Sequence, residues 1–301
     1  MKNILYNYIN PVNLMLQNIN WKRVGITVRP GKTEVDHVTR EISRFLLDQG
    51  IRVYISGIPK DQLPGGVESC SLEALDVDLV ITIGGDGTVL HTARQIRKDI
   101  PIFAVNFGSR GFLAESDPNH VLKDLKQILN HQYIIEEHIR LDVETETHKR
   151  LKALNEALLT SSIPSKMIYL ELLVDNVHLW RGFADGVIFA TPTGSTAHAA
   201  SAGGALVDLR LEATVIVFIS PLDFSMRPLV VPAASKIDIK LLEGGKDGLL
   251  VIDGQVQKPL RQGSIVQITK SQSPVKFLRL QKYSHLYRFS KLRKNLEKLI
   301  D

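Results

Sequence analysis

The sequence predicts an α/β amino-terminal domain with a parallel sheet, followed by a mainly β carboxyl-terminal domain. Residues 21–130 alternate short apolar runs with helical stretches, which is the pattern of a parallel sheet flanked by helices. Residues 131–280 place strand-like runs one after another, separated by turn residues. A chain of 301 residues with 44% apolar side chains is long enough to bury a core in each domain.

The amino-terminal domain is expected to open with a strand, a helix and a second strand. Residues 24–28, VGITV, form an apolar run of strand length. Residues 34–50, EVDHVTREISRFLLDQG, have the spacing of an amphipathic helix that ends at Gly50. Residues 51–56, IRVYIS, follow as the second strand.

The next strand, residues 77–83, reads VDLVITI and is mostly apolar, as expected of a strand buried on both faces. A helix is expected to begin near Thr88. Its apolar residues on one side are Val89, Leu90, Ala93 and Ile96.

A further strand, IPIFAVN, occupies residues 100–106. The helix predicted over residues 116–130 has Asp117 as its cap and Pro118 at its first position. Together these elements make the domain Rossmann-like.

The carboxyl-terminal domain begins its clearest pattern with residues 166–191, which break at Asp175 and Asn176 like a hairpin. A helical interruption is expected at residues 195–205, after the hydroxyl-rich TPTGST. Further strands are expected at residues 213–220, 236–243, 248–253, 264–270 and 275–281.

The two ends of the chain are expected to lie outside these domains. Residues 1–20 form an amino-terminal extension, and residues 281–301 contain a final helix expected to pack on the first domain. The extension does not fit a signal or transit peptide.

Composition excludes several classes of function. Cys70 is the single cysteine, so no internal disulfide can form. A net charge of +5 is mild, and no motif for reading nucleic acid accompanies it. No run approaches the roughly 20 apolar residues of a membrane span. We therefore expect a cytoplasmic protein that binds neither nucleic acid nor membrane.

Histidine spacing also argues against a catalytic zinc. The nine histidines are dispersed and include no His-Glu-x-x-His arrangement. No catalytic zinc and no Ser/His/Asp triad is predicted.

The glycine-rich segment GGDGT, residues 84–88, follows the buried strand and leads into a helix. Backbone amides and the helix dipole at such a position favour phosphate. Asp86 is then repelled by phosphate oxygens unless it accepts a proton or binds a cation, and both are tasks in phosphoryl transfer. The alternative is that Asp86 only caps the following helix.

Two polar clusters in the second domain are candidates for binding. Asn155 and Glu156 interrupt the apolar run ALNEALL; an amide suits a base edge, and a carboxylate can accept from two ribose hydroxyls. The alternative places this pair at a strand end that faces water. The segment around Gly194 combines Asp185, threonines and His198, and can wrap a sugar and a diphosphate; the alternative is a hydroxyl helix cap.

Two further stretches carry weaker signals. Phe112, in NFGSRGFLAE, can stack on a ring or belong to the core. Asp253 and Gln255, in VIDGQ, lie in a turn between strands, which a plain hairpin explains equally well.

These motifs, in this order, resemble the NAD kinase family. GGDGT alone is shared with diacylglycerol and sphingosine-type lipid kinases, so LNE and TPTGSTAH carry the discrimination. The full set is GGDGT (84–88), NFGSRGFLAE (106–115), LNE (154–156), DG (185–186), TPTGSTAH (191–198), SAGG (201–204), RPLV (227–230) and DGQ (253–255).

The resemblance implies transfer of a phosphoryl group to the 2′-hydroxyl of the adenosine ribose of NAD, giving NADP, with Asp86 as general base. It implies a phosphoryl donor that is ATP, with Mg²⁺ or another divalent cation, or alternatively polyphosphate, and it implies a homodimer or homotetramer. The alternatives are a lipid kinase of the diacylglycerol or sphingosine type and a non-catalytic NAD-binding sensor.

The resemblance also assigns binding residues. Asn155 and Glu156 correspond to the pair that recognises the dinucleotide, residues 193–198 to the adenosine pocket, and Asp185 to a residue that can serve a neighbouring subunit. The complete set of expected substrate and cofactor contacts is Gly84, Gly85, Gly87, Thr88, His91, Phe112, Asn155, Glu156, Lys166, Asp185, Thr193, Gly194, Ser195, Thr196, Ala197, His198, Ser201 and Gln255.

The chain departs from the family pattern at two positions. His198 stands where tyrosine is usual. The family often has a histidine in a segment PHSLSFRP, whereas this chain reads PLDFSMRP, with Asp223, over residues 221–228.

Overall fold

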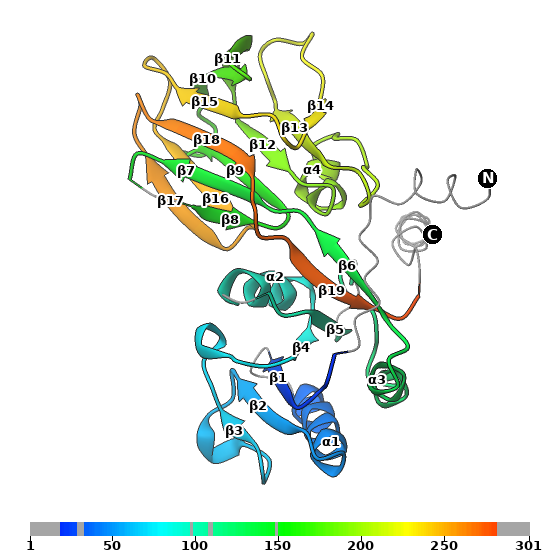
Figure 1. The fold of residues 1–301 in the computed structure, drawn as a ribbon. Coiled ribbons are helices and arrows are strands. Elements are labelled where there is room, and N and C mark those ends of the chain that lie inside the picture. Colours follow the sequence, from blue (N-terminus) through cyan, green and yellow to red (C-terminus); the bar gives the residue numbers. More distant parts are fainter. Residues whose placement is uncertain (1–18, 29–32, 97–98, 108–110, 148–149, 282–301) are drawn as a thin grey trace, which may run out of the picture. The chain divides into compact units, whose positions relative to one another are not determined.

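The computed structural model describes residues 19–28, 33–96, 99–107, 111–147 and 150–281. The chain divides into two compact units (Figure 1). The α/β unit comprises the residues up to Glu137 and those from Val275 onward, and the β unit comprises His138–Pro274. The predicted fold class, an α/β domain followed by a mainly β domain, is confirmed.

The α/β unit is built on one seven-stranded sheet with the order β3-β2-β1-β4-β5-β19-β6. Strands β3, β2, β1, β4, β5 and β19 pair in parallel, as the alternation of strands and helices predicts. Every residue of β4 is buried. The strands are β1 (Arg23–Val28), β2 (Arg52–Ser56), β3 (Glu68–Ser69), β4 (Leu79–Gly84), β5 (Ile102–Asn106), β6 (Ile134–His138) and β19 (Val275–Arg279).

Helices of this unit pack apolar faces on the sheet. In α1 (Thr33–Asp48), Val35, Val38, Ile42 and Leu46 are buried with the strand residues in one core, because their spacing puts them on one side of the helix. The remaining helices are α2 (Asp86–Gln95), α3 (Val121–Leu129) and the short 3₁₀ turns η1 (Lys60–Gln62) and η2 (Leu72–Ala74).

Two predicted helix starts differ from the structure. Helix α2 begins at Asp86 and not near Thr88, so the glycine motif itself supplies the first turn. Helix α3 begins at Val121, because Asp117 caps a separate turn ahead of it: its Oδ1 accepts the amides of Asn119 at 2.9 Å and His120 at 3.2 Å.

The division between the units differs from the boundaries expected at residues 130 and 280. Strand β6 follows α3 and joins the edge of the first sheet. The strand expected at 275–281 in the β domain is β19, which pairs in parallel with β5, Phe277 opposite Ile102. An apolar pattern predicts a strand, but the choice of sheet depends on distant partners.

The β unit consists of two six-stranded sheets. Their orders are β11-β10-β15-β18-β7-β8 and β14-β13-β12-β9-β16-β17. The strands are β7 (Leu141–Thr145), β8 (Leu151–Ala153), β9 (Glu156–Ser161), β10 (Ile168–Val174), β11 (Val177–Ala184), β12 (Gly186–Ala190), β13 (Ala213–Ile219), β14 (Leu229–Pro232), β15 (Ile237–Leu241), β16 (Gly248–Ile252), β17 (Val256–Leu260) and β18 (Ile265–Lys270).

Both sheets contribute to one core. Leu170 and Ile239 from the first sheet and Phe189 and Leu250 from the second belong to the same buried cluster. The predicted hairpin is confirmed: β10 and β11 pair antiparallel across Asp175 and Asn176, whose φ angles of 50° and 65° suit a tight two-residue turn.

The helical interruption predicted at residues 195–205 is shorter in the structure. A 3₁₀ turn, η3 (Gly194–Thr196), leads into the single-turn helix α4 (His198–Ser201). Gly203 follows with φ +84°, a conformation that ends a helix and that glycine adopts without strain.

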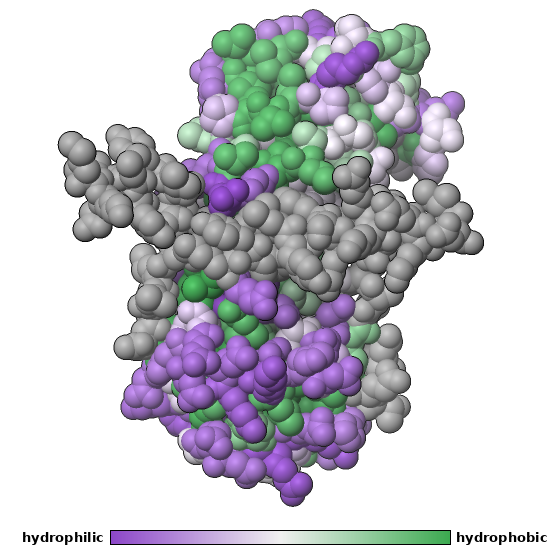
Figure 2. Space-filling view, turned by 90° about the vertical axis from the view of Figure 1, so that its right-hand side faces the viewer, coloured by the Kyte–Doolittle hydropathy of each residue, from purple (hydrophilic) through white to green (hydrophobic). Residues whose placement is uncertain are grey.

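The predicted final helix and residues 1–18 of the predicted extension lie outside the described residues. Across the described residues, no helix is both long enough and apolar enough to cross a membrane. Figure 2 shows that the β unit presents an apolar surface in the upper part of that view.

Candidate functional site

The glycine motif forms the junction between β4 and α2. β4 ends at Gly84, Gly85 is the cap of α2, and Asp86 begins the helix. A Cβ at Gly84 would lie 2.3 Å from the Thr88 Oγ1 atom, so this position requires glycine. The amide of Phe107 donates to the Gly84 carbonyl at 3.0 Å, which ties the loop to the carboxyl end of β5.

The Asp86 carboxylate is held by two backbone amides from another segment. Its Oδ2 accepts the amide of Phe112 at 3.0 Å, and its Oδ1 accepts the amide of Leu113 at 3.1 Å. Gly85, not Asp86, occupies the cap position of α2, and the cap has no side-chain hydrogen bond. A carboxylate offers about four acceptor sites, so Asp86 can accept a further hydrogen.

Other residues predicted from this motif surround the start of α2. Gly87 and Thr88 lie in its first turn, and Thr88 is buried. The pKa of His91 is lowered, chiefly by burial and further by the charge of Arg94, whose Nη2 lies 3.3 Å from the His91 Nδ1. Burial and the charge of Arg94 thus both favour the neutral form of the His91 ring.

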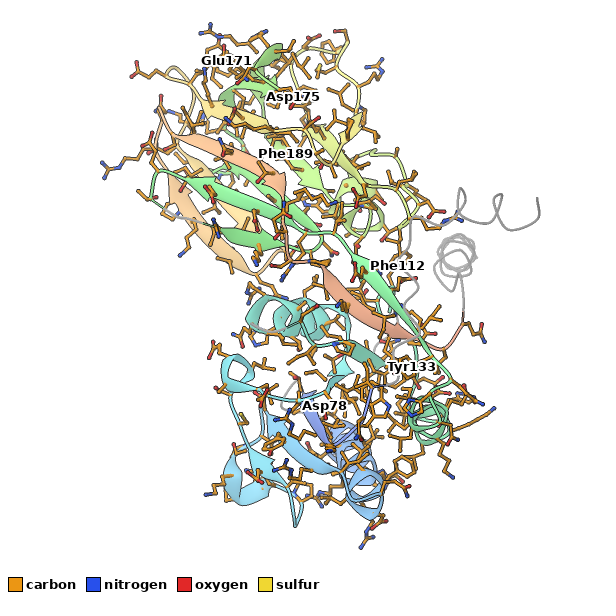
Figure 3. The ribbon with its side chains drawn as sticks, in the orientation of Figure 1. Asp78, Phe112, Tyr133, Glu171, Asp175 and Phe189 are labelled. Carbon is orange, nitrogen blue, oxygen red and sulfur yellow. The ribbon has the colours of Figure 1, made fainter. Side chains whose placement is uncertain are left out.

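Phe112, which is labelled in Figure 3, is half-buried. Its backbone amide forms the bond to Asp86 described above. The expected contacts of its ring with a substrate stay a prediction. Residues 108–110 of the same motif lie outside the described residues.

In the β unit, three motifs that are far apart in sequence meet around Asn155. The Oδ1 of Asp253, from DGQ, accepts the Asn155 amide at 2.7 Å and the Glu156 amide at 3.2 Å. Its Oδ2 accepts the Leu154 amide at 3.0 Å. Thr191, from TPTGST, donates its hydroxyl to the Leu154 carbonyl at 2.6 Å and its amide to the Asn155 carbonyl at 2.9 Å.

Gly194 makes this meeting possible. A Cβ there would lie 2.0 Å from the Asn155 carbonyl oxygen and 2.4 Å from its carbon. The Gly194 amide also donates to the Thr191 hydroxyl at 3.1 Å. The glycine therefore allows two backbone segments to pack in direct contact.

The hydroxyl groups of the expected adenosine pocket form hydrogen bonds within the protein. Ser195 is fully buried, donating to the Pro192 carbonyl at 2.6 Å and accepting the Val207 amide at 3.0 Å. The hydroxyl oxygen of Thr193 lies 2.8 Å from the Nδ1 of His138. The hydroxyl of Thr196 donates to the Thr193 carbonyl. These bonds fix the shape of the turn.

Glu156 is the least satisfied side chain of the cluster. It is 7% exposed, and its Oε2 has no hydrogen-bond partner among the described residues. Burial, and then the charge of Asp253, raise its pKa to about 7. The alternative of a strand end facing water is wrong for Glu156. A buried carboxyl oxygen without a partner costs free energy, which marks Oε2 as an atom that a ligand can satisfy.

The other predicted residues are less closely connected to this cluster. His198 and Ser201 are exposed on α4, next to the partly buried Ala197. Asp185 lies between β11 and β12, where its carbonyl accepts the Thr160 hydroxyl at 2.9 Å. Exposed turns carry the last two predicted residues, Lys166 and Gln255.

Sequence reasoning missed two participants. Asp253 was expected only in a turn, and its bonds to three distant amides leave no local signal beyond the DG pair, which favours its φ of 49°. His138 belongs to no motif, and only its contact with Thr193 reveals it.

Comparison with known proteins assigns the family. The model of the ATP-NAD kinase N-terminal domain matches residues 24–133, and that of the ATP-NAD kinase C-terminal domain matches residues 154–280. The chain belongs to the NAD kinase family. It is therefore a kinase, and these matches do not favour the lipid-kinase or sensor alternatives.

Similar members of the NAD kinase family come from archaea. An NAD kinase of Methanothermobacter thermautotrophicus is 39% identical over 93% of this chain and 96% of its own length. An NAD kinase of Methanosphaera stadtmanae is 38% identical over 86% of this chain and 95% of its own length.

Solved structures show the same fold. An NAD kinase from Archaeoglobus fulgidus in complex with ATP has a TM-score of 0.74 and 28% identity, covering 90% of this chain and 98% of that one. A yeast NADH kinase complexed with NADH has a TM-score of 0.84 over 95% and 91% of the two chains, and at 23% identity it supports the fold alone.

Proposed function

We propose that this chain transfers a phosphoryl group to the 2′-hydroxyl of the adenosine ribose of NAD, giving NADP, with Asp86 as general base. The observation that carries the proposal is the way Asp86 is held: both of its oxygens accept backbone amides, so its orientation is set before substrate binds. A preoriented carboxylate is what general-base catalysis requires.

The reaction balances with Asp86 as the proton acceptor. The ribose hydroxyl gives its proton to the carboxylate, and its oxygen bonds to the terminal phosphorus of the donor. The bond from that phosphorus to the bridging oxygen breaks, and the shortened donor leaves with the electron pair. The proton on Asp86 then passes to solvent.

The proposed phosphoryl donor is ATP. The relative from Archaeoglobus fulgidus was solved with ATP, and the glycine loop at the start of α2 suits phosphate. A divalent cation, Mg²⁺ in our proposal, screens the phosphate charges. Within the described part of the chain, no group of three or more His, Cys, Asp or Glu could hold a metal ion, so this cation would arrive with the donor.

We assign recognition of NAD to the cluster around Asn155. The Glu156 carboxyl supplies an unpartnered buried acceptor for ribose hydroxyls, and the Asn155 amide supplies a donor and an acceptor. Because Asp253 and Thr191 fix the backbone on both sides, little conformational freedom is lost on binding.

We also propose that the chain forms a homodimer or homotetramer through the β unit. All exposed large apolar side chains of the described residues lie in this unit. Five of them lie in the segments that contain or flank β13 and β14, and we call this group the apolar face: Leu206, Leu211, Leu222, Phe224 and Val230. Figure 2 shows apolar residues gathered on the surface of the β unit.

Asp223 orders the turn of this face that carries Phe224. The Oδ1 of Asp223 accepts the amide of Ser225 at 3.0 Å and its hydroxyl at 2.6 Å. The Ser225 hydroxyl is the first cause of the lowered pKa of Asp223. The turn is thereby ordered while the Phe224 side chain stays 86% exposed.

The test follows NADP formation by the purified protein with NAD and Mg·ATP, then with polyphosphate. Asp86→Asn is expected to lower turnover about a hundredfold to ten-thousandfold, the range for loss of a general base. NAD binding by calorimetry and the melting temperature show whether the variant is folded. Asp61→Asn, at an exposed position of the same unit, is the control and should keep full turnover.

Unchanged turnover in Asp86→Asn refutes Asp86 as the base. Phosphorylation of diacylglycerol with no NADP supports a lipid kinase. Binding of NAD without NADP from either donor supports a sensor.

A further inference from the structure

The α/β unit buries an arginine that the proposed reaction does not touch. Arg279, the last residue of β19, has no exposed surface. Its Nε donates to the Oε1 of Glu136 at 3.0 Å, and its Nη1 lies 3.5 Å from the Oε2 of Glu115. Buried ion pairs add little net stability, because desolvation offsets their attraction. The placement of this arginine therefore calls for another explanation.

That explanation lies in its third contact. The Nη1 of Arg279 donates to the carbonyl of Leu113 at 2.8 Å. The amide of the same residue, Leu113, donates to the Oδ1 of Asp86 at 3.1 Å, and the neighbouring amide of Phe112 donates to Oδ2. Leu113 is therefore held on one side by Arg279 and holds Asp86 on the other.

The guanidinium itself is fixed from several directions. Glu136 and Glu115 accept from it, and Glu115 also accepts the Leu280 amide at 3.0 Å. The guanidinium carbon lies 4.8 Å from the centre of the Phe277 ring. A planar group with several donors in fixed directions can bridge a carboxylate and a carbonyl, whereas a lysine ammonium at the end of a flexible stem cannot reproduce that fork.

We propose that Arg279 is a positioning residue that acts on the reaction through Leu113 and Asp86. The inference rests on the proposed function and extends it by one residue, which contacts neither substrate nor reacting atoms. When Arg279 is lost, the segment of Phe112 and Leu113 can shift and the Asp86 carboxylate shifts with it. Misplacement by about 1 Å can cost about a hundredfold in rate.

The central variant is Arg279→Lys, which keeps the positive charge and loses the fork. We expect kcat to fall about tenfold to a hundredfold, with the KM values for NAD and ATP changed by less than about twofold, because neither substrate is bound by this residue. Glu136→Gln keeps an oxygen that can accept from the Arg279 Nε but removes the charge of Glu136. It should therefore lower kcat by a smaller factor than Arg279→Lys does. NAD binding by calorimetry gives the folded fraction by which each kcat is corrected.

Lys276→Met is the matched control on the same strand. Lys276 forms ion pairs with Asp99 and with Glu137, and neither of these partners holds Asp86. Its loss removes partly exposed ion pairs from β19 and should leave kcat unchanged. If Lys276→Met and Arg279→Lys lower kcat equally, Arg279 serves only the strand and the inference is overturned.

A double variant separates this inference from the proposed function. If Arg279 acts through Asp86, Arg279→Lys should lower kcat by less than about twofold in the Asp86→Asn background, since coupled residues are not additive. The full tenfold to hundredfold loss in that background would overturn the inference and leave Asp86 as the base. Full activity of Asp86→Asn alone would instead overturn the proposed function.

Discussion

At the scale of single residues, the raised pKa of the buried Glu156 has a consequence for the stability of the fold. Its ordinary pKa of 4.5 is raised to about 7 in the folded chain, by burial and then by Asp253. The folded state therefore holds the proton more tightly than the unfolded state, and stability falls as pH rises from about 4.5 to about 7. The shift corresponds to roughly 3 kcal/mol, fully lost above that window.

Glu156→Gln should remove this pH dependence. At pH 8 the variant is expected to unfold at a higher urea concentration than the wild type, because the buried charge is gone. Near pH 4.5 the two midpoints should agree. Urea unfolding at several pH values measures this, with Glu146→Gln, an exposed position of the same unit, as the control. A difference between Glu156→Gln and the wild type that stays constant with pH would contradict the assignment.

Sequence reasoning identified the polar residues better than it identified their surroundings. Asp86 was expected because a carboxylate in a phosphate loop is unusual, and Asn155 and Glu156 because they interrupt an apolar run. What it could not supply were the groups that hold them. Leu113 acts through its backbone amide, which every residue except proline has, whereas Asp253 and Arg279 bond to backbone groups far away in sequence. The sequence alone therefore does not show which groups these residues hold.

At the scale of elements, the turn of TPTGST depends on one glycine. A Cβ at Gly194 would overlap the backbone of Asn155, which no rotamer change can relieve. Gly194→Ala should therefore destabilise the β unit by about 1 to 3 kcal/mol, the usual cost of overpacking. It should also weaken NAD binding, because Asn155 must move.

Thermal unfolding and NAD titration of Gly194→Ala check this expectation. Gly65→Ala is the control, since a Cβ there meets nothing within 4 Å and its φ is not positive. A Gly194 variant that melts with the wild type and binds NAD equally well would show that the two segments separate without cost.

Elements with strong local signals were predicted closely, and those fixed by distant partners were not. The helix expected over residues 34–50 is α1 (Thr33–Asp48), and the hairpin at Asp175 is present. Strand β19 was expected in the wrong unit, because its partner β5 is far away in sequence. The helix expected at 195–205 is reduced to α4, because Gly203 ends it.

At the scale of the whole molecule, residues that are far apart in the sequence come together in one unit. The chain leaves the α/β unit after Glu137 and returns at Val275, so a residue near the end of the sequence, Arg279, can support a loop near its beginning. The periodicity of the sequence was enough to predict the two-domain fold. It could not predict that β19 returns to the first sheet, because the sequence of β19 has the same alternation as any other strand.

Assembly is the remaining prediction at this scale. The apolar face of the β unit leaves Phe224 86% exposed and Leu222 57% exposed, which is costly for a chain that stays alone in water. The turn that carries Phe224 is ordered by Asp223 and by Arg227, whose Nη1 donates to the Phe224 carbonyl. The exposed ring is therefore held in a fixed position, as expected of a side chain that anchors a contact with another copy.

Phe224→Glu should therefore reduce the mass of the protein in solution to that of one chain, because it places charge in an apolar contact. Light scattering after size exclusion measures the mass, and we expect two or four chains for the wild type. Gln62→Glu, which adds the same charge to an exposed turn of the α/β unit, should keep the wild-type mass. A wild type with the mass of one chain, or a Phe224→Glu variant with the wild-type mass, would exclude this face as the contact between copies.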